Sequence, residues 1–404
     1  MQSLRSIFGS TAAQLEARHQ PTGLNSFFKG EATTFAEYVA QTREMLGRAH
    51  SLVGDNREKI VDGNAPFELK LQPDVFIGGK NIRRGILLTH GLSDSPYSMR
   101  HLAAFFQENG FRVMAVLLPG HGTQPGDLLE VVWQEWAKTV AFGVDRLVEE
   151  VDQVYLAGYS LGGTLSIYHS LRDNRVRGLF LFSPALQISH WAAWANFHKL
   201  YSWLMPAQKW IGIKPDRDIY KYESLPKNAA AEVHALTQKL HTQLEQQQQL
   251  KQLGIPIFAA ASVDDITVKA SATLEFMARA HHAASKLVLY TTEPEKFPAG
   301  FSAQKLELVN SVIPAQKILS FAHTATVISP EDKHYGMAGE YANCVHYYPG
   351  DSEKYTACIA NPGANFQGEV TEENLRVGIM QRLMYNPNFA ALKISMKQFI
   401  DKLP

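Results

Sequence analysis

A serine with glycines two positions before and after it is the residue of this chain best suited to nucleophilic chemistry. Ser160 stands in the segment 158–163 (GYSLGG), between an apolar run at 153–157 and a helix-forming run at 164–171. A sharp turn from a strand into a helix raises such a serine hydroxyl above the sheet. The helix N-terminus favours negative charge that develops nearby. The pattern therefore predicts a catalytic nucleophile rather than an ordinary glycine-rich turn.

A second set of residues could stabilise the oxyanion that acyl transfer at this serine would produce. His90, Gly91 and Leu92 follow directly after the apolar run 85–89. Acyl transfer needs preorganised hydrogen-bond donors for its tetrahedral intermediate. We expect the backbone N–H groups of Leu92 and Leu161 to be these donors. His90 is expected to shape the turn and not to act as a base.

Four motifs together resemble the α/β-hydrolase superfamily, and within it the monoacylglycerol lipase and carboxylesterase group. They are the segments 90–96 (HGLSDSP), 118–123 (LPGHGT), 158–163 (GYSLGG) and 262–268 (SVDDITV). The resemblance spans roughly residues 85–325. It implies a Ser-His-Asp triad and hydrolysis of carboxylic esters, such as monoacylglycerols, without a metal or organic cofactor.

In this superfamily the acid of the triad follows the serine along the chain, just past the end of a strand. The apolar run 255–260 leads to two adjacent aspartates. Members of the family typically carry a valine three residues after the acid, and Asp265 with Val268 fits that spacing. Asp264 is the alternative. Ser262 departs from the family pattern, which often has glycine there.

The base of the triad should follow the acid after one more helix and strand. The apolar run 286–290 is the expected strand, and the next histidine is His323, directly after the apolar run 318–322. We therefore predict His323 as the base. His334 is the second candidate and His346 the third.

Elements of alternating type predict the architecture that positions these residues. Expected strands lie at 67–71, 85–89, 111–118, 153–157, 178–182, 255–260 and 286–290, and expected helices at 34–52, 99–109, 133–150 and 271–280. Strands that alternate with helices at this spacing predict an α/β fold, here the α/β-hydrolase fold, with a mostly parallel sheet and helices on both faces.

The expected domains are an N-terminal helical extension at 1–65 and a hydrolase domain at 66–404 with two insertions. The first insertion, about 187–250, is helical and is expected to cap the site. Its aromatic side chains suit an apolar pocket; they are Trp191, Trp194, Phe197, Tyr201, Trp203 and Trp210. The second, about 330–370, looks loop-like and holds Cys344 and Cys358. These two cysteines could form a disulfide or remain free thiols, and their spacing does not suit a zinc site.

The charge composition gives no support for nucleic acid or a membrane surface as a binding partner. Lys+Arg and Asp+Glu both number 39, so the formal net charge is zero and gives no electrostatic case for nucleic acid or an anionic membrane surface. The sequence has no apolar stretch of about 20 residues, the length needed to span a membrane. Residues 1–20 lack the apolar core of a secretory signal, which favours the cytoplasm, although a periplasmic or secreted location is the alternative if a signal was removed.

The predicted function is hydrolysis of small-molecule esters with an apolar group. Two alternatives stay open from the sequence. One is an amidase, peptidase or thioesterase, which would use the same triad. The other is a binding protein with the hydrolase fold but no turnover, because function is set by the site and not by the fold.

Overall fold

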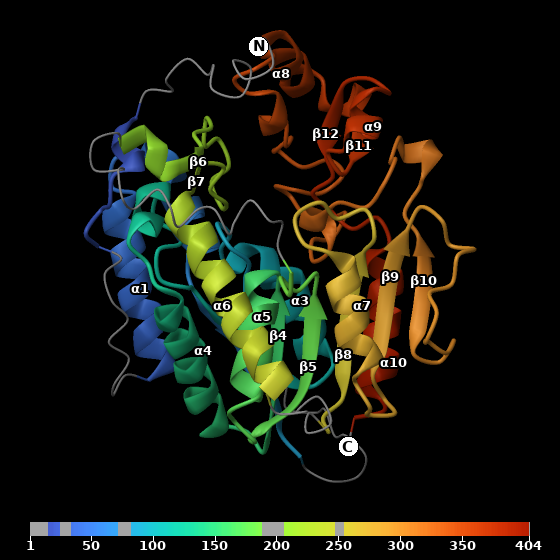
Figure 1. Cartoon of the computed structure of the whole chain (residues 1–404). Coiled ribbons are helices and arrows are strands. Elements are labelled where there is room, and N and C mark those ends of the chain that lie inside the picture. The colour runs from blue at the N-terminus through green and yellow to red at the C-terminus, as the bar shows by residue number, and fades with distance from the viewer. Residues whose placement is uncertain (1–14, 25–33, 72–81, 188–205, 247–253, 404) are drawn as a thin grey trace.

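The computed structural model describes residues 15–24, 34–71, 82–187, 206–246 and 254–403 of the chain (Figure 1). Its centre is an eight-stranded sheet with the order β1-β3-β2-β4-β5-β8-β9-β10. The strands are β1 (Phe67–Leu69), β2 (Arg84–Thr89), β3 (Phe111–Val116), β4 (Gln153–Tyr159), β5 (Val176–Phe182), β8 (Ile257–Ser262), β9 (Lys286–Thr291) and β10 (Leu306–Asn310). All pairings are parallel except that of β1 with β3. The predicted α/β-hydrolase fold is confirmed.

The central strands are apolar on both faces because helices cover both faces. Every residue of β2 is buried, and its side chains alternate between two cores. Leu87 belongs to one core and Ile86 and Leu88 belong to the other, as the twofold side-chain period of a strand requires. A parallel sheet covered in this way produces the near-continuous apolar runs of the sequence.

One face of the sheet packs against α4, α5, α6 and α7, and the other against α3 and α10. The helices are α3 (Arg100–Glu108), α4 (Trp133–Val148), α5 (Leu161–Ser170), α6 (Lys227–Gln246), α7 (Ala270–Ala278) and α10 (Phe389–Ile400). Parallel strands end at the same edge of the sheet, and β4 and β8 therefore deliver the loops after Tyr159 and Ser262 to one side of the molecule. None of the helices in the described ranges has the length and apolar character needed to cross a bilayer.

The N-terminal region contains the expected helix, α1 (Phe35–Ala49), and a second one, α2 (Arg57–Asn64). Thr34 caps α1 through a capping box with Glu37, an arrangement that satisfies two backbone donors at the helix start. Phe35 and Tyr38 pack against Phe142 of α4. This packing ties α1 to the hydrolase domain.

The segment between β5 and β8 is described only in part. Its described elements are β6 (Trp210–Gly212), β7 (Leu225–Pro226) and α6. Trp210 is buried. Of the predicted cap aromatics, the other five lie outside the described residues: Trp191, Trp194, Phe197, Tyr201 and Trp203.

The C-terminal segment between β10 and α10 is more regular than the loop expected from its sequence. It contains α8 (Ser352–Ala360), α9 (Glu372–Leu375) and a small parallel sheet of β11 (Phe366–Gly368) and β12 (Met380–Arg382). Cys344 and Cys358 form a disulfide within it, which decides the alternative that the sequence left open. Figure 1 shows this segment, coloured red, above the edge of the sheet at which β9 and β10 end.

Candidate active site

Ser160 lies on a sharp turn between β4 and α5. Its φ angle is 52° and its ψ angle −114°, a conformation that is strained for a residue with a side chain. The Ser160 carbonyl accepts hydrogen bonds from the N–H groups of Gly163 and Thr164 at 3.0 and 3.2 Å, which starts the helix immediately after the serine. The residue is 8% exposed. The turn therefore has the geometry that the sequence predicted for Ser160.

The glycines on either side of the serine leave no room for a side chain. A Cβ atom on Gly158 would lie 2.2 Å from the backbone carbon of Gly162, and a Cβ on Gly162 would lie 2.0 Å from the carbonyl oxygen of Thr89. Both contacts are with backbone, which cannot move aside as a flexible side chain can. The small residues of the motif thus allow the turn to pack directly on β2.

Gly162→Ala is expected to lower the free energy of unfolding by about 1–3 kcal/mol or more, because the added methyl group overpacks a site closed by backbone. Urea unfolding of the variant measures this change. Gly363→Ala is the matched control, because its new Cβ would have no atom within 4 Å; its effect should stay within about 0.5 kcal/mol. Equal effects of the two substitutions would contradict the steric explanation.

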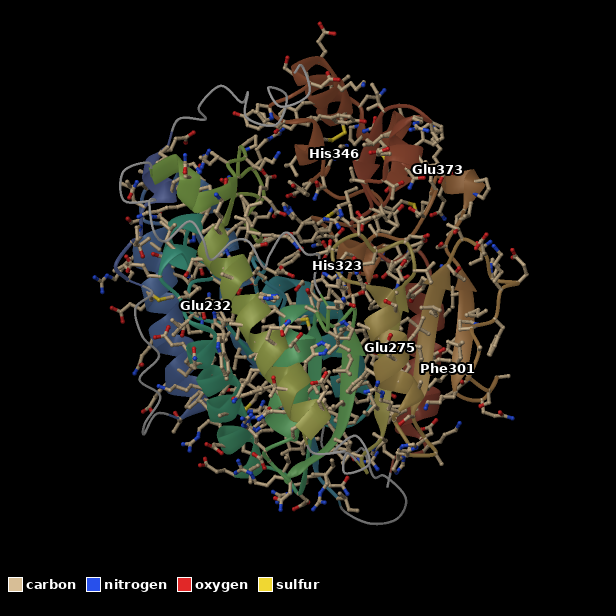
Figure 2. The ribbon with its side chains drawn as sticks, viewed as in Figure 1. Glu232, Glu275, Phe301, His323, His346 and Glu373 are labelled. Atoms are coloured by element: carbon tan, nitrogen blue, oxygen red, sulfur yellow. A yellow bond between two sulfur atoms is a disulfide. The ribbon has the colours of Figure 1, made fainter. Side chains whose placement is uncertain are left out.

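His323 faces the serine from the loop that follows β10. It begins a short 3-10 helix, η9 (His323–Ala325), and its Nε2 lies 3.0 Å from Ser160 Oγ. The side chain of Tyr159 donates a hydrogen bond to the His323 carbonyl at 3.2 Å. Figure 2 shows His323 at the junction of the sheet and the C-terminal segment. The 3.0 Å between His323 Nε2 and Ser160 Oγ is within the range for proton transfer between a nucleophile and its base.

Asp265 lies on the other side of the imidazole. Its Oδ2 is 2.5 Å from His323 Nδ1, and its Oδ1 accepts the N–H groups of Thr267 and Val268 at 2.7 and 2.9 Å. Burial alone would raise the pKa of this carboxyl, but His323 and the two N–H donors hold the pKa below its usual value. Asp265 is therefore suited to remain ionised and to orient the imidazole.

Asp264 has a different position from its neighbour. Its Oδ2 accepts hydrogen bonds from Ser311 Oγ at 3.0 Å and from the Phe321 N–H at 3.3 Å, and burial raises its pKa. Ser262, the departure from the family pattern, donates to the Phe321 carbonyl at 2.8 Å. Both side chains thus join the loop of Asp265 to the loop of His323.

The other candidate histidines have other partners or positions. His334 Nε2 lies 3.1 Å from Asp218 Oδ1, and His346 lies in the C-terminal segment, away from His323 in Figure 2. His90 accepts the Leu118 N–H at 3.0 Å through Nε2, so its ring links the ends of β2 and β3. Of the candidate bases, the structure brings His323 to Ser160.

Leu92 and Leu161, the residues whose N–H groups are the predicted oxyanion donors, line the cavity beside Ser160. Leu161 is the first residue of α5, and the first N–H groups of a helix have no acceptor within the helix. Leu92 follows Gly91, whose missing side chain allows contact with Tyr159 and Ser160; a Cβ there would lie 3.1 Å from the Tyr159 ring and 3.3 Å from Ser160 Cβ. Both residues thus lie next to Ser160, and their role as oxyanion donors stays a prediction.

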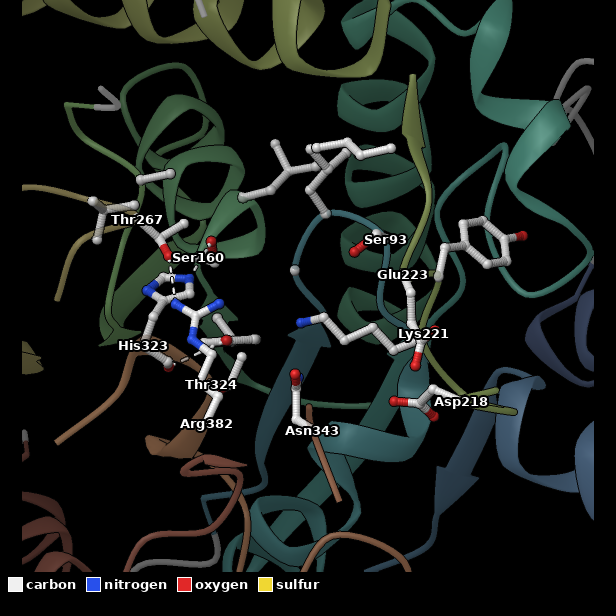
Figure 3. Close-up of a pocket in the computed structure, with 18 of the residues that line it drawn as sticks. Ser93, Ser160, Asp218, Lys221, Glu223, Thr267, His323, Thr324, Asn343 and Arg382 are labelled. Atoms are coloured by element: carbon white, nitrogen blue, oxygen red, sulfur yellow. Dashed lines mark hydrogen bonds between the residues drawn. The ribbon is translucent and has the colours of Figure 1, made fainter. Parts of the chain in front are cut away.

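A cavity of about 270 Å³ opens beside these groups (Figure 3). One part of its wall is apolar and is formed by Leu92, Leu161, Ala185, Leu225, Val233 and Val268. Another part carries charged or amide side chains, which are Asp218, Lys221, Glu223, Asn343 and Arg382. Within the described ranges, no group of three or more His, Cys, Asp or Glu side chains is arranged to hold a metal ion.

Two residues that the sequence did not single out connect the C-terminal segment to His323. The Glu369 carboxylate, fully buried, accepts the His323 N–H at 3.1 Å. Arg382 donates to Glu369 at 2.9 Å and to the Thr267 hydroxyl at 2.8 Å. Glu369 lies 46 residues after His323 and belongs to no motif, so the sequence could not predict this contact. The pair joins the loops of Asp265 and His323 from outside.

Comparison with known proteins places this geometry in a family. The family model described as "Serine aminopeptidase, S33" matches residues 80–292, more than half of the chain. A thermostable monoacylglycerol lipase of Bacillus sp. (strain H-257) is 32% identical over 109 residues, which are 27% of this chain and 44% of that protein. A carboxylesterase of Bacillus subtilis (strain 168) is 31% identical over 97 residues, 24% of this chain and 38% of that protein.

The matches thus cover less than half of the length of either relative. Among solved structures, the monoacylglycerol lipase of Paleococcus ferrophilus is 18% identical with a TM-score of 0.43, covering 56% of this chain and 88% of the other. The family match extends from just before β2 to the end of β9, and it includes the turn of Ser160 and the loop of Asp265. The chain therefore belongs to the serine aminopeptidase S33 family of α/β hydrolases.

Proposed function

We propose that this protein hydrolyses carboxylic esters through an acyl-enzyme on Ser160, with His323 as general base and Asp265 as the acid that orients it. The observation that carries the proposal is the continuous hydrogen-bonded series from Ser160 Oγ through the imidazole to the Asp265 carboxylate. The series opens on a cavity lined by Leu92 and Leu161, whose N–H groups are the proposed oxyanion donors. The names of the two relatives, a monoacylglycerol lipase and a carboxylesterase, support esters as the substrate class.

The proposed reaction has two halves. Ser160 Oγ attacks the acyl carbon while His323 Nε2 takes its proton, and the resulting oxyanion is held by the N–H groups of Leu92 and Leu161, each worth about 3–4 kcal/mol in the transition state. Collapse of this intermediate breaks the ester bond, and Nε2 returns the proton to the departing alcohol. A water molecule, deprotonated by His323, then attacks the acyl-enzyme; the bond between the acyl carbon and Ser160 Oγ breaks, Nε2 returns the proton to Oγ, and the acid is released.

The apolar part of the cavity supports a substrate with an apolar group. Leu225 and Val233, which lie in β7 and α6, face the same cavity as Leu92 and Val268. These contacts support the proposal that the insertion at about 187–250 acts as a cap over the site. Residues 1–65 and about 330–370 are likewise proposed as an extension of, and an insertion into, the hydrolase domain at 66–404.

Two alternatives to ester hydrolysis are an enzyme that cleaves amides or thioesters and a binding protein that cleaves no bond. The family description names a serine aminopeptidase, and such an enzyme, like an amidase or a thioesterase, would use the same three side chains. A binding protein without turnover is disfavoured by the short contacts among Ser160, His323 and Asp265. The relatives' names favour esters over amides.

Labelling with a fluorophosphonate and a panel of acyl substrates tests the proposal. We expect the wild-type protein to form a covalent adduct on Ser160, identified by peptide mass spectrometry, and to hydrolyse 4-nitrophenyl esters of short and medium chains. The matched 4-nitroanilides and thioesters should have lower kcat/KM values. Absence of both labelling and turnover would exclude a serine hydrolase, and faster cleavage of anilides would favour the amidase alternative.

A further inference from the structure

Lys221 brings a positive charge into the cavity beside Ser160. Its side chain lines this cavity, and Figure 3 shows the ammonium end directed into it. Among the described residues, no carboxylate oxygen lies within 4.0 Å of the ammonium and no hydrogen bond from it is found. A charge held in a partly enclosed pocket loses hydration, and an anion that compensates it is therefore bound favourably.

The backbone on both sides of Lys221 is held in place. The ring of Tyr220 stacks on Tyr97 with 3.7 Å between ring centroids. The N–H of Tyr222 donates to the Ser93 carbonyl at 2.7 Å. Ser93 directly follows Leu92, one of the two proposed oxyanion donors. The position from which Lys221 enters the cavity is thus fixed relative to the reacting groups.

The carboxylates of the cavity wall are engaged by other donors. Both oxygens of Asp218 accept the Tyr335 hydroxyl at 2.8 Å, and Glu223 accepts the Tyr341 hydroxyl at 2.6 Å. Burial also raises the pKa of the Glu223 carboxyl. Neither group is placed to neutralise Lys221 by direct contact.

The remaining charges near the cavity make no direct contact with Lys221 either. Arg382, the other cation of the wall, is paired with Glu369. Asp94 is near enough for the charge of Lys221 to act on its pKa, which burial raises on balance, but no ion pair or hydrogen bond joins the two among the described residues. Of the two cations among the described residues that line the cavity, Lys221 is therefore the one without a contacting counter-charge.

Asn343 supplies a second polar group without a partner. Its side chain lines the same cavity and the residue is 8% exposed. The Oδ1 atom has no hydrogen-bond partner within the described ranges, while the amide nitrogen donates to Met384 Sδ at 3.4 Å. Figure 3 shows the oxygen end of Asn343 and the ammonium end of Lys221 directed into the same part of the cavity. A buried acceptor left unpaired is costly, and a ligand with a donor would satisfy it.

We propose that the substrate of this site is an ester that also carries a carboxylate, such as a monoester of a dicarboxylic acid, with Lys221 binding the carboxylate. A hydroxyl or N–H of the same ligand would donate to Asn343 Oδ1. This proposal rests on the proposed ester hydrolysis and adds a polar end to the otherwise apolar substrate. The ester carbonyl is placed at Ser160 and the anionic end on the opposite, charged part of the wall.

The test compares mono-4-nitrophenyl adipate with 4-nitrophenyl hexanoate, which have acyl chains of equal length with and without the carboxylate. In Lys221→Met the ratio of kcat/KM for adipate to that for hexanoate is expected to fall about 10- to 100-fold, the value of a hydrogen bond to a charged group. Lys221→Arg should keep most of the ratio. Asn343→Asp should lower it, because the new carboxylate competes for the same cation. An unchanged ratio in Lys221→Met would overturn the proposal.

Binding provides a measurement that does not depend on turnover. In the Ser160→Ala background, calorimetry with monomethyl adipate and methyl hexanoate should show tighter binding of the anion, and Lys221→Met should remove the difference. Equal binding of both ligands before and after the substitution would refute the role of Lys221, even if esters are hydrolysed. If Lys221→Met removes the preference for monomethyl adipate but the wild-type protein cleaves no ester, the role of Lys221 in binding stands and only the proposed ester hydrolysis is refuted. Lys296→Met, at an exposed lysine paired with Glu293, is the control and should alter neither readout.

Discussion

Ser160→Ala is expected to lower kcat for ester hydrolysis by about 10⁶-fold and to abolish fluorophosphonate labelling. In the proposed mechanism the Ser160 hydroxyl forms the acyl-enzyme, and its oxygen lies 3.0 Å from the His323 Nε2 that takes its proton. His323→Ala should cost about as much, because without the base the serine is a weak nucleophile. The double variant should be no slower than either single variant, since the two groups act as one unit.

Initial rates with 4-nitrophenyl butyrate at enzyme concentrations high enough to detect the residual reaction measure these losses. Ser170→Ala is the matched control, because this serine lies at the other end of α5 and donates to the Ile167 carbonyl within the helix. Its kcat should stay within about twofold of wild type, in line with a loss of at most a few tenths of a kcal/mol. Additive losses in the double variant, or a Ser160→Ala protein that retains activity, would contradict the assigned roles.

Asp265→Asn is expected to reduce kcat by about 10⁴-fold with little change in KM. An amide in place of the carboxylate presents an N–H or a weaker acceptor to His323 Nδ1, so the imidazole loses the tautomer that accepts the serine proton. The carboxylate also stabilises the imidazolium formed during attack, and its lowered pKa keeps it ionised at neutral pH. Steady-state kinetics at pH 7–8 measure the effect.

Asp264→Asn separates the two adjacent aspartates. Its carboxyl contacts Ser311 and Phe321 rather than the imidazole, and an asparagine oxygen can still accept both hydrogen bonds. We therefore expect a change in kcat of less than about tenfold, smaller than one fully lost hydrogen bond to a charged group would give. A large loss in Asp264→Asn together with a small loss in Asp265→Asn would reverse the assignment.

The sequence predicted the parts of the fold that depend on local pattern. The buried runs at 85–89, 153–157 and 255–260 became β2, β4 and β8 because a strand covered on both faces needs continuous apolar residues. It missed β10, whose Leu306–Asn310 backbone pairs only with β9 at the edge of the sheet. Three of its five residues are half-buried and one is exposed, so no apolar run marked it.

Some residues of the proposed site could also be predicted from local sequence pattern, and others could not. The Ser160 turn was predictable because its glycines respond to backbone neighbours a few residues away or on the adjacent strand. The position of Val268 predicts Asp265 over Asp264, and in the structure the Val268 N–H donates to Asp265 at 2.9 Å, whereas Asp264 accepts the Phe321 N–H. Glu369, Arg382 and Lys221 were not predicted, because their roles arise from tertiary contacts that no spacing encodes.

Through Glu369, the C-terminal segment holds the backbone of the loop that carries His323. A chain that stopped near residue 330 would retain the serine, the aspartate and the histidine, yet the buried N–H at position 323 would have lost its acceptor. An unpaired buried donor costs about 1–3 kcal/mol, enough for the imidazole loop to rearrange. Removal of Arg382 as well would take away the guanidinium that is paired with Glu369.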